Sequence, residues 1–288
     1  MFIPELFKDD KVVFSCEIFP PKKDGSIDSI YSTLEQLASI KPDFISVTYG
    51  AGGSTEQKKT GDIASIIKHD YGIEPIAHLT CINSSREDIL EMLKDLKEKG
   101  IENVLALRGD RNPNLPLSKD FKYAYQLVEL VKECGGFNVS GACYPEGHSE
   151  CESLDLDILH LKHKVDCGVT HLMSQLFFDN EDFYRFYEKT LAAGINVPIE
   201  AGIMPVVNKK QILRMVTLCG ASLPKKFVKI INRFENNPQA LYDAGVAYAS
   251  EQIIDLVSSG VKGIHLYTMN KPDIAKRIYD NTKTIIRA

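Results

Sequence analysis

Short apolar segments alternate with helical segments along all 288 residues of this chain, and this alternation limits its fold more than any other feature. The expected strands are Val12–Phe19, Phe44–Tyr49, Pro75–Thr80, Asn103–Arg108, Asn138–Tyr144, His171–Phe178, Pro198–Pro205 and Gly263–Thr268. Parallel strands need helical crossovers between them, so eight unbroken strand–helix units predict an α/β fold with a parallel sheet. The number of units and the length both fit closure into a (β/α)8 barrel, the TIM barrel, which occupies about 250 residues.

Three of the expected helices end just before a glycine. They are Asp88–Lys99, Tyr123–Cys134 and Asp182–Ala193. Glycine suits this position because the chain turns through positive φ at a helix C-terminus. A further helical segment, Pro224–Glu235, is expected between the seventh strand and the long helix that precedes the eighth.

An open, doubly wound sheet is the alternative α/β fold. A dinucleotide-binding sheet of that kind carries Gly-x-Gly-x-x-Gly after its first strand. The nearest match, residues 50–55, follows the second strand and has Thr55 in place of the third glycine. Since no composition break or linker divides the chain, we expect residues 1–288 to form a single catalytic domain.

The composition excludes several classes of partner. A net charge of −5 provides no basic patch for nucleic acid or anionic lipid. No apolar run approaches the roughly 18 residues that a membrane helix needs, and the first ten residues lack the plan of a signal peptide. We therefore expect a cytoplasmic protein with no nucleic-acid or membrane partner.

The seven cysteines include no Cys-x-x-Cys pair, so neither a zinc ribbon nor an iron–sulfur cluster is expected. Cys143, His148 and Cys151 are close in sequence, but their spacing fits no standard metal site. An odd number of cysteines in a protein that is not secreted favours reduced thiols. We expect no metal ion.

Polar side chains gather at the carboxyl ends of seven expected strands. They are Glu17, Thr48, Tyr49, His78, Arg108, Asp110, Tyr144, His148, Gln175 and Asn270. One such residue alone is typical of a solvated barrel rim, but seven strands agreeing at one end indicate an active site. Cys16, Ile18 and Phe19 surround Glu17, and their desolvation should raise its pKa. A protonated carboxyl near neutral pH can act as a general acid.

A second polar group lies on the helix that follows the fifth strand. Asp157, His160 and Lys164 are spaced at i, i+3 and i+7, which places them on one face. Such a face is often only solvated. Together with Arg108 and His148 it could instead hold the hydroxyls and phosphates of an extended cofactor.

Six motifs in this sequence resemble the methylenetetrahydrofolate reductase family. They are residues Phe14–Pro21, Ser46–Ala51, His78–Cys81, Leu105–Asp110, Tyr144–His148 and Gln175–Asp179. The motifs follow the family order at matching spacings over almost the whole chain. The resemblance implies a (β/α)8 barrel with non-covalent FAD across the strand ends. It also implies hydride transfer from reduced flavin to 5,10-methylenetetrahydrofolate, which yields 5-methyltetrahydrofolate.

The resemblance also implies residue roles. Glu17 matches the acid that protonates the folate, and Asp110 matches a carboxylate near both the flavin and the pterin. The substrate-binding positions implied are Glu17, Asp110, Gln175, Gln211 and Lys271. The cofactor-binding positions implied are Thr48, Tyr49, Ala51, His78, Arg108, Gly109, Asp110, Ala124, Tyr144, His148, Cys151, Asp157, His160, His163 and Lys164.

Several positions depart from the family pattern. Lys271 stands where relatives often carry arginine, so a bidentate contact becomes a point contact. Cys151, His160 and His163 replace other residue types near the cofactor. Met215 occupies a position where some relatives have an aromatic ring, which weakens the case for NADH. The electron donor stays open between NADH, NADPH and a partner protein, as does assembly into a homo-oligomer or hetero-complex.

Two other functions fit parts of the sequence. A zinc-dependent methyltransferase barrel acting on methyltetrahydrofolate would need paired zinc ligands, which Cys81 and Cys143 alone do not supply. A non-catalytic subunit that carries flavin or folate would not need an acid at Glu17. Both alternatives are therefore disfavoured.

Overall fold

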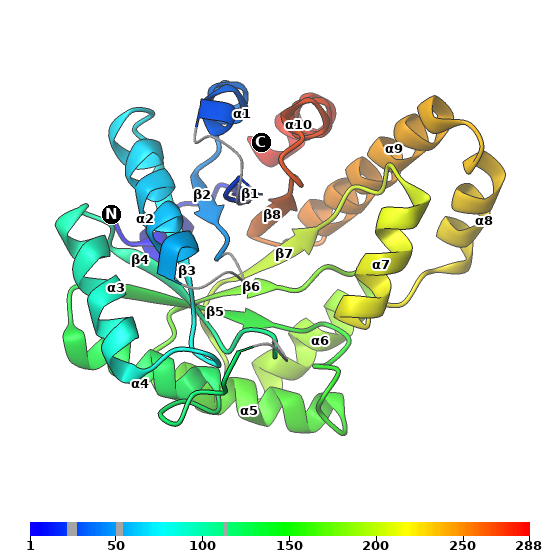
Figure 1. Cartoon of the computed structure of the whole chain (residues 1–288). Helices are drawn as coiled ribbons and strands as arrows, with labels where there is room; N and C mark the ends of the chain where they lie inside the picture. The colour runs from blue at the N-terminus through cyan, green and yellow to red at the C-terminus, as the bar shows by residue number, and fades with distance from the viewer. Residues whose placement is uncertain (22–27, 50–53, 112–114) are drawn as a thin grey trace.

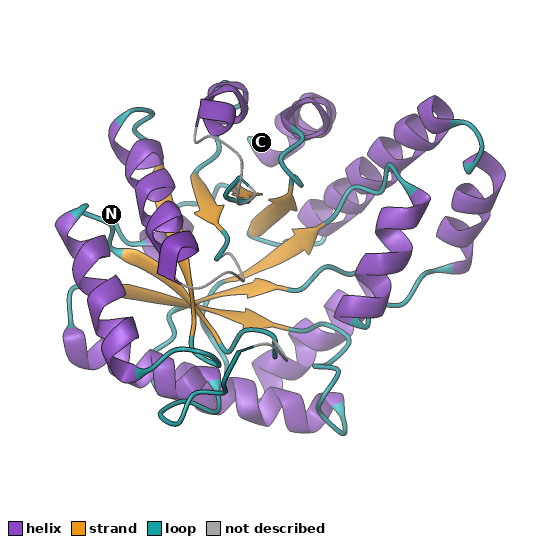
Figure 2. Ribbon diagram, viewed as in Figure 1, coloured by secondary structure: helices purple, strands orange, loops and turns teal. Residues whose placement is uncertain are grey.

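A computed structural model of the chain describes residues 1–21, 28–49, 54–111 and 115–288. Within these ranges the strands form a closed, all-parallel barrel in the order β1 to β8, and β1 pairs with β8 to close it. The helices encircle the strands (Figures 1 and 2). The predicted (β/α)8 barrel is confirmed, and the alternative of an open sheet is wrong.

All the expected strands are present. They are β1 (Val13–Ile18), β2 (Phe44–Val47), β3 (Glu74–Thr80), β4 (Asn103–Leu107), β5 (Asn138–Cys143), β6 (His171–Ser174), β7 (Ile199–Ile203) and β8 (Gly263–Tyr267). The predicted end of the sixth strand, at Phe178, is wrong. Phe177 and Phe178 are buried because their rings pack on Phe183 and Phe227, with centroids 5.1 and 5.3 Å apart, after strand pairing has ended.

The helices are η1 (Ile3–Lys8), α1 (Asp28–Ala38), α2 (Ser54–His69), α3 (Arg86–Glu98), α4 (Ala124–Cys134), α5 (Leu154–Asp166), α6 (Asn180–Ala192), α7 (Lys209–Cys219), α8 (Lys225–Phe234), α9 (Pro238–Ser258) and α10 (Pro272–Ile286). Gly100, Gly135 and Gly194, which follow three of them, have φ of 71°, 64° and 76°, as predicted. The expected extra helix is α8. No helix in the described ranges is both long and apolar enough to cross a membrane.

The core leaves one end of the barrel accessible. Strand residues such as Phe14, Cys16 and Ile18 belong to the large apolar cluster shared with the surrounding helices. At the amino end of the barrel, Ile3 and Leu6 of η1 join a second buried cluster with residues from the strands. Because η1 covers this end, a ligand has access from the carboxyl ends of the strands, where TIM barrels carry their active sites.

Candidate active site

A cavity of about 470 Å³ opens at the carboxyl ends of the strands. Ten residues predicted from the sequence line it: Glu17, Thr48, Tyr49, His78, Arg108, Gly109, Asp110, Tyr144, His148 and Gln175. They come from the ends of the first six strands, which supports the expectation that these residues gather at one mouth. Met204 and Tyr267 contribute to the lining from the ends of β7 and β8.

Glu17 lies deep in the cavity and is only 7% exposed. In the strand register it lies between Ser46 of β2 and Tyr267 of β8. Burial raises the pKa of Glu17 from 4.5 to about 7, although the neighbouring His78 pulls that pKa down. The carboxyl therefore retains its proton in a large share of molecules at neutral pH, as the sequence predicted.

Two imidazole rings flank this acid. Nε2 of His78 lies 3.7 Å from Oε2 of Glu17, and Nε2 of His265 lies 3.8 Å from the same atom. Burial lowers the pKa of each histidine to about 4, so both rings are neutral at pH 7. The acid therefore stands between neutral groups, and no charged imidazole draws its proton away.

The end of β8 holds the site together; the sequence placed Asn270 at this strand end but gave no contacts for it or for Tyr267 and Thr268. The hydroxyl of Thr268 donates to the carbonyl of Glu17 at 2.6 Å, and that of Tyr267 donates to the carbonyl of Ser174 at 2.7 Å. Asn270 exchanges two hydrogen bonds with the backbone of Phe19, of 2.8 and 2.9 Å. The alternation of side chains along β8 could have revealed this part of the site, because it places His265 and Tyr267 on the same face of the strand.

The segment after β4 supplies a cation and a carboxylate. Arg108 forms a two-pronged contact with Glu150, with nitrogen–oxygen distances of 2.6 and 3.0 Å. Gly109 has φ of 85°, and a Cβ atom there would lie 2.9 Å from Cβ of Thr80. Glycine is thus required by contact with the protein itself, whereas the resemblance implied only a contact with the cofactor. Asp110 follows directly in the cavity wall.

The loop after β5 joins the cavity to α5. The backbone N–H of His148 donates to the Asp157 carboxylate at 3.1 Å, and the ring of His148 meets that of Tyr144 edge to face. Nδ1 of His148 accepts a hydrogen bond from the N–H of Glu150, so a neutral ring carries its proton on Nε2. Burial raises the pKa of Asp157.

Lys164, predicted on the same polar face, points elsewhere. Its ammonium donates to the carbonyl of Ala142, and burial lowers the pKa of this amine. The ammonium therefore supports β5 in this structure. A contact between Lys164 and a cofactor stays a prediction.

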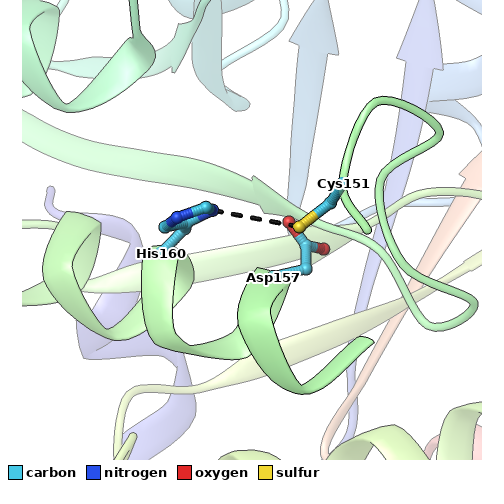
Figure 3. A group of neighbouring side chains, drawn as sticks. All are labelled: Cys151, Asp157 and His160. Atoms are coloured by element: carbon cyan, nitrogen blue, oxygen red, sulfur yellow. Dashed lines mark hydrogen bonds between the residues drawn. The ribbon is translucent and has the colours of Figure 1, made fainter. Parts of the chain in front are cut away.

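Three side chains, those of Cys151, Asp157 and His160, lie next to one another (Figure 3). Sγ of Cys151 lies 4.0 Å from Nδ1 of His160, and one ligand atom from each of Cys151, Asp157 and His160 lies within 4.8 Å of the others. A metal ion could bridge such a group. The three metal-binding candidates that are close in sequence, Cys143, His148 and Cys151, form a different set, and Cys143 lies in the buried core.

The remaining predicted residues lie outside the described cavity lining. His163 contacts Sγ of Cys167 at 3.9 Å and packs on the ring of Tyr125. Ala124 begins α4, and Lys271 is the exposed residue before α10. Gln211 lies in the first turn of α7, one turn before Met215, which does line the cavity. Ala51 lies outside the described residues.

The model of the methylenetetrahydrofolate reductase family matches residues 3–283. The 5,10-methylenetetrahydrofolate reductase of Pectobacterium carotovorum is 38% identical over 270 residues, which covers 93% of this chain and 89% of that protein. The Escherichia coli enzyme of the same name is 36% identical, and the match covers 92% of this chain and 88% of that protein. An uncharacterized protein from Clostridium thermocellum that binds two copies of 5-methyl-5,6,7,8-tetrahydrofolic acid shares the fold, with a TM-score of 0.71, 13% identity and 99% coverage of both chains.

Proposed function

This chain belongs to the methylenetetrahydrofolate reductase family and reduces 5,10-methylenetetrahydrofolate, and we propose that it uses non-covalent FAD and Glu17 as the general acid. The observation that supports this mechanism is the carboxyl of Glu17. It faces the cavity, is almost completely buried, and titrates near neutrality. A group with these properties can deliver a proton where solvent cannot.

The residues around the cavity fit a flavin dinucleotide. Leu105, Leu107 and Met173 give one part of the lining an apolar surface for a planar ring. Arg108 and His148 supply hydrogen-bond donors at another part, suited to phosphate and hydroxyl groups. Arg108 is paired with Glu150, which is exposed, so a phosphate group could replace that carboxylate. When bound, the flavin would supply the hydride.

The substrate folate would meet two carboxyl groups. Glu17 would protonate its five-membered ring, which opens and leaves a methylene iminium that can accept hydride. Asp110 and Gln175 line the same cavity and would orient the pterin. The side-chain carbonyl of Gln175 accepts a hydrogen bond from the N–H of Leu176 at 2.9 Å, which fixes its orientation before substrate binds.

The electron donor is proposed to reach the flavin through the same mouth. NADH, NADPH and a partner protein all remain candidates, and Met215 of α7 is the side chain of this chain that we expect a nicotinamide to meet. Methionine is adaptable and polarizable, but it offers no aromatic plane for stacking.

The zinc-dependent alternative gains no support. Burial raises the pKa of Cys81 and of Cys143 to about 12, which disfavours the thiolates that zinc requires. Among the described residues, neither cysteine belongs to a group of three ligand atoms close enough for one ion.

Glu17→Gln tests the proposal. Gln keeps the size and polarity of the side chain but has no proton to give, so folate turnover should fall by about 10²-fold or more. FAD binding and reduction of the flavin should be retained, and both are measured on the same sample. Glu98→Gln, on the exposed surface of α3, is the matched control. Near wild-type turnover by Glu17→Gln would show that another group is the acid.

A further inference from the structure

A layer of polar side chains fills the interior of the barrel beneath Glu17. Ser15, His265, Glu200, His171 and Ser140 are each 0% exposed, and they come from β1, β8, β7, β6 and β5. A carboxyl without exposure to water is costly unless its neighbours hydrogen-bond to it or share its proton. The proposed function of the protein gives this layer no role.

Ser15 joins two members of the layer. Its hydroxyl donates to Oε1 of Glu200 at 3.0 Å and lies 2.7 Å from Nδ1 of His265. On the other side of Glu200, Oε2 lies 3.3 Å from Nε2 of His171, whose Nδ1 is 3.0 Å from the hydroxyl of Ser140. Glu200 is thus contacted from both sides by groups able to donate to a carboxylate.

The layer reaches the active site through His265. Its Nε2 lies 3.8 Å from Oε2 of Glu17 and hydrogen-bonds to none of the described residues. Ser15 and Glu17 are two residues apart on β1, so their side chains point to the same face of the strand. A small movement of either side chain would complete a continuous path from Glu17 through His265 and Ser15 to Glu200.

We propose that Glu200 is a second buried acid that shares one proton with Glu17 through His265 and Ser15. This role rests on Glu17 being the acid of the proposed function. His265 and Ser15 are positioning residues, because they act on the substrate only through Glu17.

The hydrogen atoms balance between two states. In the first, Glu17 is protonated and donates to Nε2 of His265, Nδ1–H of His265 donates to Ser15, and Ser15 donates to the Glu200 carboxylate. In the second, Glu200 is protonated and donates to Ser15, Ser15 donates to Nδ1 of His265, and Nε2–H of His265 donates to the Glu17 carboxylate. Each bond to hydrogen that breaks is matched by one that forms, and no other reactant is needed.

The surroundings favour sharing over release of the proton. His78 from β3 and Tyr267 from β8 also face Glu17, and His171 from β6 faces Glu200. The thiol of Cys16 on β1 points to the helices, although the charge of Glu200 still raises its pKa. At the amino end of the barrel, the Phe7 ring centroid lies 5.3 Å from that of His171 and covers the layer. Two carboxylates inside this enclosure repel each other, so ionised Glu200 favours the neutral form of Glu17.

The first test titrates Glu17 in protein free of FAD and folate. The infrared band of its protonated carboxyl is identified by difference from Glu17→Gln and followed against pH in wild type and in Glu200→Gln. Removal of the buried negative charge should lower the midpoint of Glu17 by about one pH unit, a tenfold loss of proton affinity. An unchanged midpoint would overturn the proposal.

The second test compares Ser15→Ala with Ser140→Ala. Both serines are 0% exposed, and each lies against Nδ1 of a histidine, but only Ser15 connects the two acids. Above pH 7, Ser15→Ala should slow folate turnover roughly tenfold without slowing flavin reduction, and Ser140→Ala should leave both rates unchanged. Equal rates in the two variants would overturn the relay, and the titration of Glu200→Gln provides the measurement if Ser15→Ala does not fold.

These outcomes separate the relay from the proposed function. If Glu17→Gln keeps its folate turnover, the assignment of the acid has failed whatever the titration shows. If Glu17→Gln loses turnover while Glu200→Gln and Ser15→Ala behave as wild type, only the relay has failed.

Discussion

The rate of folate reduction should fall as the pH rises through about 7. A carboxyl with the ordinary pKa of 4.5 would be protonated in about 0.3% of molecules at pH 7, whereas one that titrates at about 7 is protonated in about half. Burial therefore increases the population of the active acid by roughly 150-fold at neutral pH. Only the protonated form can act, so the rate should be constant well below pH 7 and should fall about tenfold per unit well above it.

The neighbours of Glu17 leave this dependence simple. Burial lowers the pKa of both His78 and His265 to about 4, so neither ring changes its charge between pH 6 and 9. The assay is stopped-flow reoxidation of the reduced, FAD-loaded protein by methylenetetrahydrofolate without oxygen. The rate at pH 9 should be about 1% of its limiting value at low pH.

Two results would refute this assignment. One is a reoxidation rate that stays constant from pH 6 to 9. The other is a fall with the same midpoint in Glu17→Gln, because the titrating group would then be a different residue. Reduction of the flavin by dithionite, followed over the same pH range, is the control for general loss of structure.

The remaining predictions concern stability, potential, cofactor placement and electron donor. At pH 8 Glu17→Gln should raise the free energy of unfolding by up to about 3 kcal/mol, and at pH 5 by less than about 1 kcal/mol. The sign follows from the raised pKa of Glu17: below its unfolded-state pKa of 4.5 the protonated carboxyl does not destabilise the fold, and this advantage is lost as the pH rises through about 7. Gln stays neutral at every pH, so the variant does not lose stability in this way; urea unfolding at both pH values tests it. Asp110→Asn should raise the flavin midpoint potential and weaken folate binding together, because a nearby negative charge disfavours the anionic reduced flavin; no change in either would place Asp110 outside the site. FAD should protect Cys151 from iodoacetamide and leave Cys167, at the far end of α5, unprotected; equal labelling with and without FAD would contradict binding over that face. NADH should reduce the flavin slowly when no other protein is present, and rapid, saturable bleaching in stopped flow would show that no partner is needed.

The positions of most residues of the candidate site could be predicted, because the barrel topology brings all the strand ends to one side of the molecule. Each strand ends at the same mouth, so Thr48, His78 and Arg108 could be grouped without knowledge of any contact. The burial of Glu17 could also be predicted, from its apolar neighbours on β1. The glycines that end helices could likewise be predicted from the local sequence, because glycine readily adopts the positive φ found there.

Residues whose role depends on a contact with an adjacent element could not be predicted in this way. Lys164 falls on the polar face of α5 by periodicity, yet its ammonium reaches the carbonyl of Ala142. Gly109 suggested contact with a ligand, yet its conformation is explained by Thr80 on the neighbouring strand. In both cases the observed contact depends on how an adjacent element packs. The periodicity of a helix or strand in the sequence carries no information about that packing.

The polar interior of the barrel is the clearest example of this limit. Alternation along β1 directs Phe14 and Cys16 to the helices and leaves Ser15 and Glu17 for the interior. The sequence cannot say which inward side chain of β7 or β8 meets them, because that depends on barrel register and side-chain reach. Only the structure brings Ser15 between Glu200 and His265. Aliphatic side chains would fill the same space without the cost of desolvating a carboxyl. The buried acid Glu200, which is connected to Glu17 through Ser15 and His265, is therefore better explained by proton transfer than by packing.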